Sequence, residues 1–353
     1  MQRRSNIREL SPAQLEEALL AMGEKKFRAK QVHQWLWQKH AGSFEEMTNL
    51  SKSLREKLKA NYEIGQAQIE NRLHSRDGTV KYAFKLTNGQ EVEGVLIPTR
   101  TRVTACISSQ AGCSLACKFC ATGFLDLKHN LRHYEIYDQV FSLNQESERH
   151  FGKPLSNVVY MGMGEPLLNY RNMMGSIEMI TSELGMGMSP RRITVSTAGV
   201  AKLIKRLGDD GARFEFALSL HAANDAKRNQ IMPINESNSL DALKDALTYF
   251  YEKTHTRITY EYILLKDLND GLEDARELVE FVRHVPSKVN LIEYNPVAGT
   301  GFQLTTSRRL DDFIAYLEKH GVIVNVRRSR GKDVDGACGQ LAMKRWEKIP
   351  ATT

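Results

Sequence analysis

The sequence predicts an α/β fold: a parallel sheet covered by helices, with a small helical module before it. Three observations support this. Apolar runs with strand character alternate six times with stretches of helical periodicity, a rhythm typical of parallel sheets. Ahead of this repeat, Asn88-Gly89 stands between two alternating stretches, as in a β-hairpin. Residues 1–68 carry helical patterns with capping residues.

The length of 353 residues allows one large domain and a smaller one. We expect four segments along the chain. They are a helical accessory domain (1–68), a bridging β-hairpin (69–98), a main body that ends in the loop around Cys338 (99–341), and a tail (342–353).

Composition and charge narrow the class of protein. Hydrophobic residues make up 41% and charged residues 26% of the chain, which is typical of a globular protein. No apolar run is long enough for a transmembrane helix, and the N-terminus lacks the apolar stretch of a signal peptide, so we expect a cytoplasmic protein without a membrane partner. Residues 1–102 carry 18 Lys or Arg against 12 Asp or Glu. This excess favours a nucleic-acid partner, although a solvated basic surface would explain it equally well.

The N-terminal module is expected to be entirely helical. The first helix covers 11–22, where Ser11 and Gln14 form a capping box. A second helix covers about 28–39, and helical patterns continue at 43–46 and 50–58. Two tryptophans, Trp35 and Trp37, could stack on RNA bases, but we favour a role in the core of the module.

The predicted hairpin has strands at 81–86 and 91–98. The second strand places Glu91 and Glu93 on the same face, because side chains two residues apart on a strand point the same way. From the residues alone, both carboxylates could form a solvated face.

The main body supplies the parallel sheet. Strands are predicted at 103–108, 157–161, 192–196, 213–219, 257–264 and 288–294, followed by a further strand at 322–327. Helices are predicted between them at 134–149, 169–184, 199–207, 238–253, 271–284 and 306–320. Either an open doubly wound sheet or a partial barrel fits this order. In both, ligands bind at the carboxyl ends of the strands, where the polar and glycine-rich segments of this sequence fall.

Four of the five cysteines lie between Cys106 and Cys120, and the last three are spaced Cys113-x3-Cys117-x2-Cys120. Three thiolates on one loop can hold three irons of a [4Fe–4S] cluster and leave the fourth iron open to a small molecule. The alternatives are a structural zinc site, completed by His129 or His133, and three buried thiols without a metal.

The cysteine motif resembles the signature of the radical S-adenosylmethionine (SAM) superfamily. Gly162-Met-Gly-Glu165-Pro, after the second strand of the main body, resembles the glycine-rich segment that holds the amino group of SAM in that superfamily. Glu165 is the one carboxylate expected there to accept a hydrogen bond from an ammonium or a ribose hydroxyl.

Over nearly its full length the chain resembles the dual-specificity RNA methyltransferases (RlmN). This family methylates carbon 2 of adenosine in 23S ribosomal RNA and in transfer RNA, there at the adenosine 3′ of the anticodon. The resemblance rests on six motifs: the segments around Glu93, Cys106–Cys113, Met161–Asn169, Ser189–Gly199, Ala217–Ala222 and Asp335–Leu341.

The resemblance implies a partial (βα)6 barrel, an RNA-binding helical module, one [4Fe–4S] cluster per chain and two SAM molecules per turnover. It also implies an electron donor such as a flavodoxin-type protein, and we expect a monomer. The implied cluster ligands are Cys113, Cys117 and Cys120. The implied SAM-binding residues are Gly164, Glu165, Ser196, Ser219, Leu220, His221 and Asn295.

Three further roles follow from the resemblance. Cys338 carries the methyl group, Cys106 is the thiol that resolves the enzyme–RNA adduct, and Glu93 accepts the proton. The chemistry is consistent with this division, because carbon 2 of adenine is not a nucleophile and a thiolate is. Without the resemblance, Cys106 and His221 could equally be core residues.

Two other functions stay open. A related branch methylates carbon 8 of adenosine in ribosomal RNA and confers antibiotic resistance, and the segment after Glu165 resembles the carbon-2 family more closely. A zinc-stabilised RNA-binding protein without catalysis is the second alternative. Methylthiotransferase chemistry is disfavoured because its second cluster needs three more cysteines and only two remain.

Overall fold

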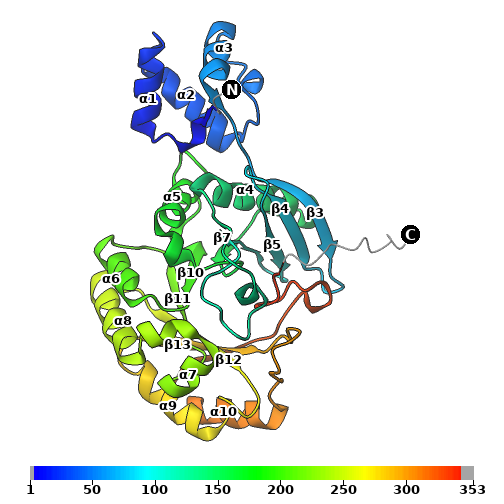
Figure 1. Cartoon of the computed structure of the whole chain (residues 1–353), viewed down its shortest axis with the longest axis vertical. Coiled ribbons are helices and arrows are strands. Elements are labelled where there is room, and N and C mark those ends of the chain that lie inside the picture. Colours follow the sequence, from blue (N-terminus) through cyan, green and yellow to red (C-terminus); the bar gives the residue numbers. More distant parts are fainter. Residues whose placement is uncertain (1–3, 343–353) are drawn as a thin grey trace.

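The computed structural model describes residues 4–342 and is built around one sheet of ten strands (Figure 1). Seven neighbouring strands are parallel, as the strand–helix rhythm predicts. In spatial order they are β6 (Val103–Cys106), β9 (Asn157–Tyr160), β10 (Ile193–Thr197), β11 (Glu215–Ser219), β12 (Ile258–Leu264), β13 (Ser287–Glu293) and β14 (Val324–Arg327). Every residue of β12 is buried, which is typical of a parallel strand covered on both faces.

Helices connect these strands and pack on the outer side of the curved sheet, so the partial barrel is confirmed (Figure 1). The connecting helices are α4 (His133–Phe151), α5 (Tyr170–Thr181), α6 (Ala201–Asp209), α7 (Asp225–Ile231), α8 (Leu240–Thr254), α9 (Leu272–Val282) and α10 (Ser307–Lys319). The sequence predicted all of them except α7. That helix has only seven residues, too few for its periodicity to be recognised.

Three antiparallel strands extend the sheet beyond β6. They are β3 (Gln68–His74), β4 (Val80–Lys85) and β5 (Glu91–Pro98). The sequence predicted β4 and β5 but not β3, whose residues are mostly polar and which forms one edge of the sheet. Since β5 pairs with β6, the predicted hairpin is continuous with the parallel sheet.

The N-terminal module contains α1 (Pro12–Ala21), α2 (Phe27–His33) and α3 (Lys52–Asn61). The capping box is present: the Ser11 hydroxyl accepts a hydrogen bond from the Gln14 backbone, and the Ser11 backbone donates to the Gln14 side chain. The module is not entirely helical, because β1 (Ser5–Asn6) and β2 (Tyr62–Glu63) form a short parallel pair.

The second predicted helix of the module changes form before it ends. A π-helical turn at Gln34–Gln38 follows α2. Trp37 in this turn is buried, whereas Trp35 is half-buried and its indole N–H donates to the Asn49 side chain at 2.6 Å. The predicted place in the core of the module therefore fits Trp37 better than Trp35.

Shorter elements complete the fold. Two-residue strands β7 (Gln110–Ala111) and β8 (His129–Asn130) pair beside the cysteine loop. Turns of 3₁₀-helix lie at Ile7–Glu9, Phe44–Glu46, Ala121–Phe124, Pro166–Asn169, Pro190–Arg192, Pro233–Ser237 and Lys332–Val334. Between residues 4 and 342, no helix is both long and apolar enough to cross a membrane. Apart from Ala342, the predicted tail lies outside the described residues.

Candidate active site

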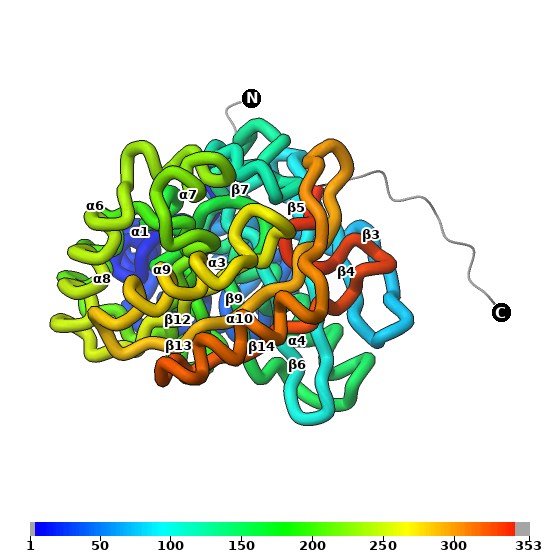
Figure 2. Tube along the Cα trace, turned by 90° about the horizontal axis from the view of Figure 1, so that it is seen from below, coloured from blue at the N-terminus to red at the C-terminus, as the bar shows by residue number. Residues whose placement is uncertain are grey.

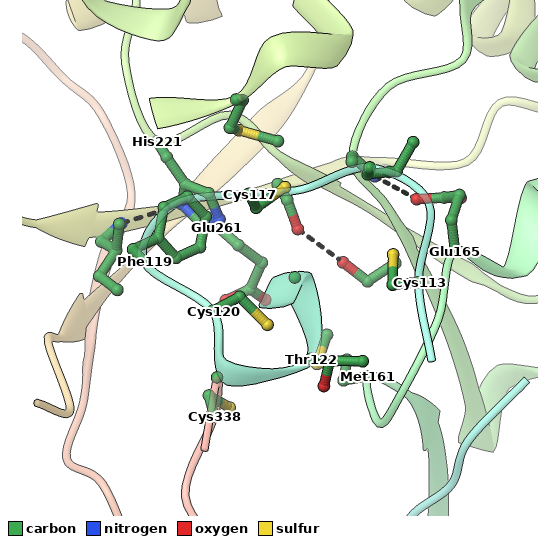
Figure 3. Close-up of a pocket in the computed structure, with 18 of the residues that line it drawn as sticks. Cys113, Cys117, Phe119, Cys120, Thr122, Met161, Glu165, His221, Glu261 and Cys338 are labelled. Carbon is green, nitrogen blue, oxygen red and sulfur yellow. Dashed lines mark hydrogen bonds between the residues drawn. The ribbon is translucent and has the colours of Figure 1, made fainter. Parts of the chain in front are cut away.

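A cavity of about 160 Å³ opens at the carboxyl ends of the parallel strands, where the sequence places the ligand site (Figure 3). The loop after β6 contributes three cysteines to its wall. The loops after β9, β10 and β11 contribute further predicted residues. The predicted residues that line this cavity are Cys113, Cys117, Cys120, Gly164, Glu165, Ser196, Ser219 and His221, together with Cys338.

The three cysteines of the motif are free thiols, and each is half-buried. Burial raises the pKa of Cys113 to about 11 and also raises the pKa values of Cys117 and Cys120. A metal cluster binds the thiolate form, so loading the site must release protons. The donor set is all sulfur, which suits iron–sulfur chemistry.

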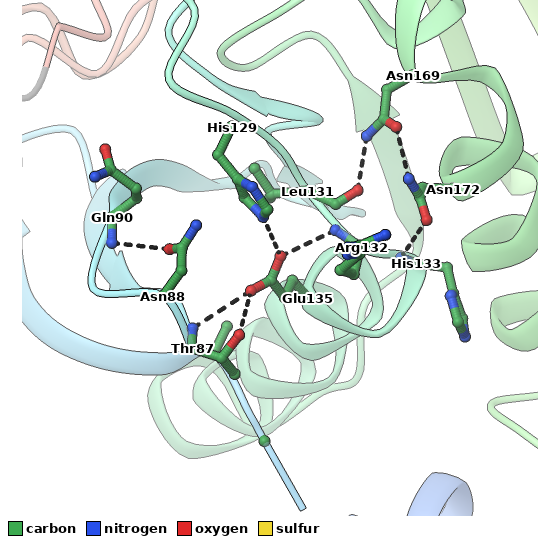
Figure 4. Close-up of polar contacts among 12 residues, drawn as sticks. Thr87, Asn88, Gln90, His129, Leu131, Arg132, His133, Glu135, Asn169 and Asn172 are labelled. Atoms are coloured by element: carbon green, nitrogen blue, oxygen red, sulfur yellow. Dashed lines mark hydrogen bonds and ion pairs between the residues drawn. The ribbon is translucent and has the colours of Figure 1, made fainter. Parts of the chain in front are cut away.

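The site is a poorer fit for a single zinc ion. Ligands of one zinc ion must all lie about 2.0–2.3 Å from it, and among residues 4–342 no three His, Cys, Asp or Glu side chains are grouped in this way. The two histidines considered as a fourth ligand are engaged elsewhere, and Figure 4 shows the contact of the His129 ring. The His129 ring contacts the Glu135 carboxylate at 3.0 Å, and the His133 ring contacts the Arg8 carbonyl at 3.0 Å.

The glycine-rich segment has no room for side chains. A Cβ atom at Gly164 would lie 2.4 Å from Gln110 Cβ, and the φ of Gly164 is +93°. The same Gln110 side chain accepts a hydrogen bond from the Glu165 backbone at 2.7 Å. A glycine is therefore required where this loop passes the β7 segment.

Glu165 is buried, and burial raises its pKa. Its two carboxylate oxygens accept backbone hydrogen bonds from Leu167 at 3.0 Å and Ala198 at 2.7 Å. Glu165 thus ties the loop after β9 to the loop after β10 while it lines the cavity. A second carboxylate, Glu261 of β12, lines the cavity as well.

His221 presents a defined hydrogen-bond donor. Burial lowers its pKa to about 3, so the ring is neutral. Nδ1 accepts a hydrogen bond from the Ile263 backbone at 3.1 Å, which places the ring proton on Nε2. The ring packs edge-on against Phe119 of the cysteine motif, with 4.8 Å between ring centroids (Figure 3). The fold therefore fixes both the tautomer and the orientation of this residue.

Asn295 and Leu220 differ from the other predicted SAM-site residues because neither lines the cavity wall. Leu220 is fully buried. The Asn295 amide donates to the Cys338 carbonyl at 3.1 Å, and its Oδ1 atom is buried without a hydrogen-bond partner among the described residues. A buried unpaired acceptor is costly, so this atom suits a ligand that brings a donor.

Two residues that sequence analysis missed, Glu261 and Arg327, also line this cavity. Arg327, at the end of β14, forms a 3.0 Å ion pair with Glu261 of β12. Asn290 donates to the other oxygen of Glu261 at 2.8 Å. The only signal in the sequence was a carboxylate within an otherwise apolar strand.

A second cavity of about 230 Å³ adjoins the first. Cys106 and Cys338 both line it, although they are more than 200 residues apart in sequence. Burial raises the pKa of Cys106 to about 12. Cys120, Arg327 and Cys338 line both cavities, so the second opens directly beside the cysteine loop.

Glu93 lines neither cavity. It is fully buried on β5, and its carboxylate forms a 3.0 Å ion pair with Lys81 of β4. The other oxygen accepts a hydrogen bond at 3.1 Å from the backbone of Ala342, four residues after Cys338. Glu93 is therefore placed beside the end of the Cys338 loop, while Glu91 on the same face is exposed.

Two protein-family models match the chain. Residues 5–64 match the ribosomal RNA large subunit methyltransferase N-terminal domain, and residues 107–282 match the radical SAM superfamily. These ranges contain the helical module and most of the parallel strands. The chain is thus a radical SAM protein, a superfamily that uses a [4Fe–4S] cluster and SAM.

Curated relatives cover almost the whole chain. The probable dual-specificity RNA methyltransferase RlmN of Cytophaga hutchinsonii is 54% identical, over 96% of this chain and 93% of that protein. The protein of the same name from Christiangramia forsetii is 53% identical, over 97% of each chain. A crystal structure of a radical SAM methyltransferase from Sphaerobacter thermophilus has 36% identity and a TM-score of 0.89, over 96% of this chain and 99% of that one. The chain therefore belongs to the RlmN family of dual-specificity RNA methyltransferases, which are radical SAM enzymes.

Proposed function

We propose that this enzyme methylates carbon 2 of adenosine in 23S ribosomal RNA and in transfer RNA, at the adenosine 3′ of the anticodon, with Cys338 as the methyl carrier. One observation carries the proposal: Cys106 and Cys338 line one cavity, and Cys338 also lines the cavity of the cluster-motif cysteines. A cysteine in that position can exchange groups with ligands on both sides.

The cofactors follow from the first cavity. Cys113, Cys117 and Cys120 would hold one [4Fe–4S] cluster per chain. The SAM site would be formed by Gly164, Glu165, Ser196, Ser219 and His221, which line this cavity, together with Leu220 and Asn295, which do not line it. The loaded site supplies a methyl group from one SAM and, after reduction by a donor such as a flavodoxin-type protein, a carbon radical from a second. The neutral Nε2–H of His221 and the unpaired Oδ1 of Asn295 offer one donor and one acceptor to hold SAM.

The residues divide the remaining chemistry. Cys338 would accept the methyl group on its sulfur, and the methyl group would give one hydrogen atom to the SAM-derived carbon radical. The resulting methylene carbon would bond to carbon 2 of adenine. The adduct would then return one electron to the oxidised cluster, and Glu93 would take the proton from carbon 2. The Cys106 thiolate attacks the Cys338 sulfur, so an S–S bond forms and the C–S bond breaks. The released carbon takes up a proton and becomes the methyl group, and the disulfide must be reduced before the next turnover.

The test is anaerobic reconstitution followed by mass mapping of adenosine in ribosomal and transfer RNA treated with the enzyme, SAM, an electron donor that reduces the cluster, and a thiol reductant. We expect 2-methyladenosine in both RNAs. A carbon-8 product, or a protein that binds one zinc ion and gives no methylated RNA, would overturn the proposal.

Two variants test the division of roles between the thiols. Cys338→Ala should assemble the cluster normally and transfer no methyl group to RNA. Cys106→Ala should accumulate protein that is covalently bound to RNA, visible as a shifted band on a denaturing gel. If Cys106→Ala turns over freely, another group resolves the adduct.

A further inference from the structure

The chain contains a cluster of cations beside the second cavity that the proposed chemistry does not use. The segment Arg327-Arg328-Ser329-Arg330-Gly331-Lys332 follows directly from β14 and leads into the Cys338 loop. Arg327, Arg328 and Arg330 all line the cavity that contains Cys106 and Cys338. Three guanidinium groups around one cavity attract anionic ligands.

Three of the four cations in this segment are already neutralised. Arg327 pairs with Glu261 at 3.0 Å. Arg330 contacts the Asp77 carboxylate at 3.5 Å and donates to the Asp77 carbonyl at 2.7 Å. Lys332 pairs with Glu293 at 3.0 Å. These three side chains are fixed by internal contacts, so they contribute to the structure of the segment.

Arg328 is different. It is exposed, and within residues 4–342 its guanidinium has no hydrogen bond or ion pair to another side chain or to the backbone. An arginine that only covers a solvated surface need not line a cavity, but Arg328 does. The carboxylates of Glu261 and Asp77 are paired with Arg327 and Arg330, whereas the Arg328 guanidinium remains available to a ligand.

The position of Arg328 also indicates which anion it meets. Arg328 lines the second cavity, whereas the wall of the first cavity includes Arg327 but not Arg328. A carboxylate of SAM would bind in the first cavity, beside the cysteine motif. The ligand of the second cavity is the one that must reach Cys106 and Cys338, and on the proposed function this is RNA.

We propose that Arg328 binds a backbone phosphate of the substrate RNA at the mouth of the second cavity and so directs the target adenosine toward Cys338. This inference rests on the proposed function for the identity of the ligand. A planar guanidinium suits a phosphate because it can donate two parallel hydrogen bonds to its oxygens. The cavity, at about 230 Å³, is far larger than the roughly 30 Å³ of one water molecule, so it has room for part of a nucleotide.

The experiment measures RNA binding by the reconstituted enzyme without SAM, so that no reaction occurs. An unmodified transfer RNA transcript is titrated at several salt concentrations against the wild type, Arg328→Gln and Arg328→Lys. For Arg328→Gln we expect about tenfold weaker binding. The slope of log affinity against log salt should also fall by roughly 0.7–1, the value for one lost phosphate contact. Arg328→Lys keeps the charge and should retain most of the slope.

Arg283→Gln is the matched control. Arg283 is exposed at the end of the outer helix α9 and lines neither cavity, so this variant loses the same charge elsewhere. It should bind RNA as the wild type does. The inference is overturned if Arg328→Gln keeps the wild-type affinity and slope. It is also overturned if Arg283→Gln weakens RNA binding as much as Arg328→Gln does. The same holds if the salt slope of Arg328→Lys falls as far as that of Arg328→Gln.

The two proposals fail in different ways. If the wild type forms 2-methyladenosine and Arg328→Gln binds RNA normally, only the inference about Arg328 is wrong. If RNA binding depends on Arg328 but the wild type forms no 2-methyladenosine, the phosphate contact stands and the proposed reaction is wrong.

Discussion

At the scale of single residues, Glu93 shows how a carboxylate is kept inside the protein. It is fully buried, and its partner Lys81, which is almost as buried, lies on the neighbouring strand β4, two residues from the position directly opposite Glu93. An ion pair of this kind gives little net stability, but removal of one partner leaves an uncompensated charge. The sequence could place Glu93 on its strand but could not show which cation it meets, because that depends on the register between β4 and β5.

We expect Lys81→Met to lower the free energy of unfolding by about 3–5 kcal/mol, since it leaves the Glu93 carboxylate buried without its cation. Chemical denaturation measures this. Lys85→Met is the control, because Lys85 lies on the same strand and pairs with the exposed Glu70 at 3.2 Å. Exposed pairs contribute about 0–1 kcal/mol. Equal losses in the two variants would show that burial of Glu93 does not create the dependence on Lys81.

A second residue prediction concerns the glycine-rich loop. Gly164→Ala should weaken SAM binding by tenfold or more, because the added Cβ would collide with Gln110 and displace the loop that carries Glu165. Calorimetric titration of the reconstituted protein measures this. Gly187→Ala is the matched control: its φ is also positive, at +64°, but nothing lies within 4 Å of the added Cβ. If the two variants bind SAM with similar affinity, the lack of space around Gly164 is not the reason that glycine is required there.

At the scale of elements, the N-terminal module is fixed to the core through α4. The Arg8 guanidinium lies 2.6 Å from the Asp138 carboxylate of α4 and 4.5 Å from the Trp37 ring centroid. The Tyr137 hydroxyl donates to the Trp37 carbonyl at 2.6 Å, and the His133 ring stacks on Trp37. Sequence analysis predicted α4 from its periodicity but not this contact, because the π-helical turn that places Trp37 has no sequence pattern of its own.

The hydrogen bonds at the start of α4 include another contact that the sequence could not predict (Figure 4). Glu135 accepts hydrogen bonds from the backbone and hydroxyl of Thr87, at the end of β4, and from the backbone of Arg132. Its other contact is His129 of β8. One buried carboxylate thus joins the turn after β4 to the segment before α4, and no local pattern in the chain predicts its contact with Thr87, 48 residues away.

The docking of the module should depend on pH through His133. Burial and the nearby Arg8 guanidinium lower its pKa to about 4, below the ordinary value of 6.5. The folded state therefore favours the neutral ring. Its contribution to stability is fully present above about pH 6.5 and is lost as the pH falls toward 4.

We expect the melting temperature of the wild type to fall between pH 7 and pH 4.5 by more than that of His133→Gln, which keeps a donor for the Arg8 carbonyl but does not titrate. Thermal unfolding at a series of pH values measures the difference. Titrating groups elsewhere in the protein contribute to both proteins and cancel in the comparison. Parallel curves would show that protonation of His133 is not linked to unfolding.

At the scale of the whole molecule, the beginning and the end of the core meet beside the active site. The turn between β3 and β4 lies against the loop that leads to Cys338, and Figure 2 shows the red C-terminal segment running beside these two strands. Asp77 of the turn accepts a hydrogen bond from the Gly331 backbone at 2.9 Å, and Asp333 of the loop accepts from the Ser75 hydroxyl at 2.5 Å. The parallel strands and the loops after them could be predicted from local periodicity. These long-range contacts could not, because they join polar segments about 250 residues apart.

The antiparallel extension therefore has a mechanical role in addition to carrying Glu93: it holds the Cys338 loop closed over the second cavity. We expect Asp77→Ala to increase amide hydrogen exchange in residues 331–341 by about tenfold, because the segment loses the hydrogen bond from the Gly331 backbone, which contributes about 1 kcal/mol, and the ion pair of Arg330. RNA methylation should fall, while SAM affinity should stay the same, since Asp77 does not line the first cavity. Asp126→Ala is the control, because this aspartate is exposed and, among residues 4–342, its carboxylate pairs only with Lys128, at 3.5 Å. If exchange in the loop is unchanged in Asp77→Ala, the contacts between the turn and the loop do not hold Cys338 in place.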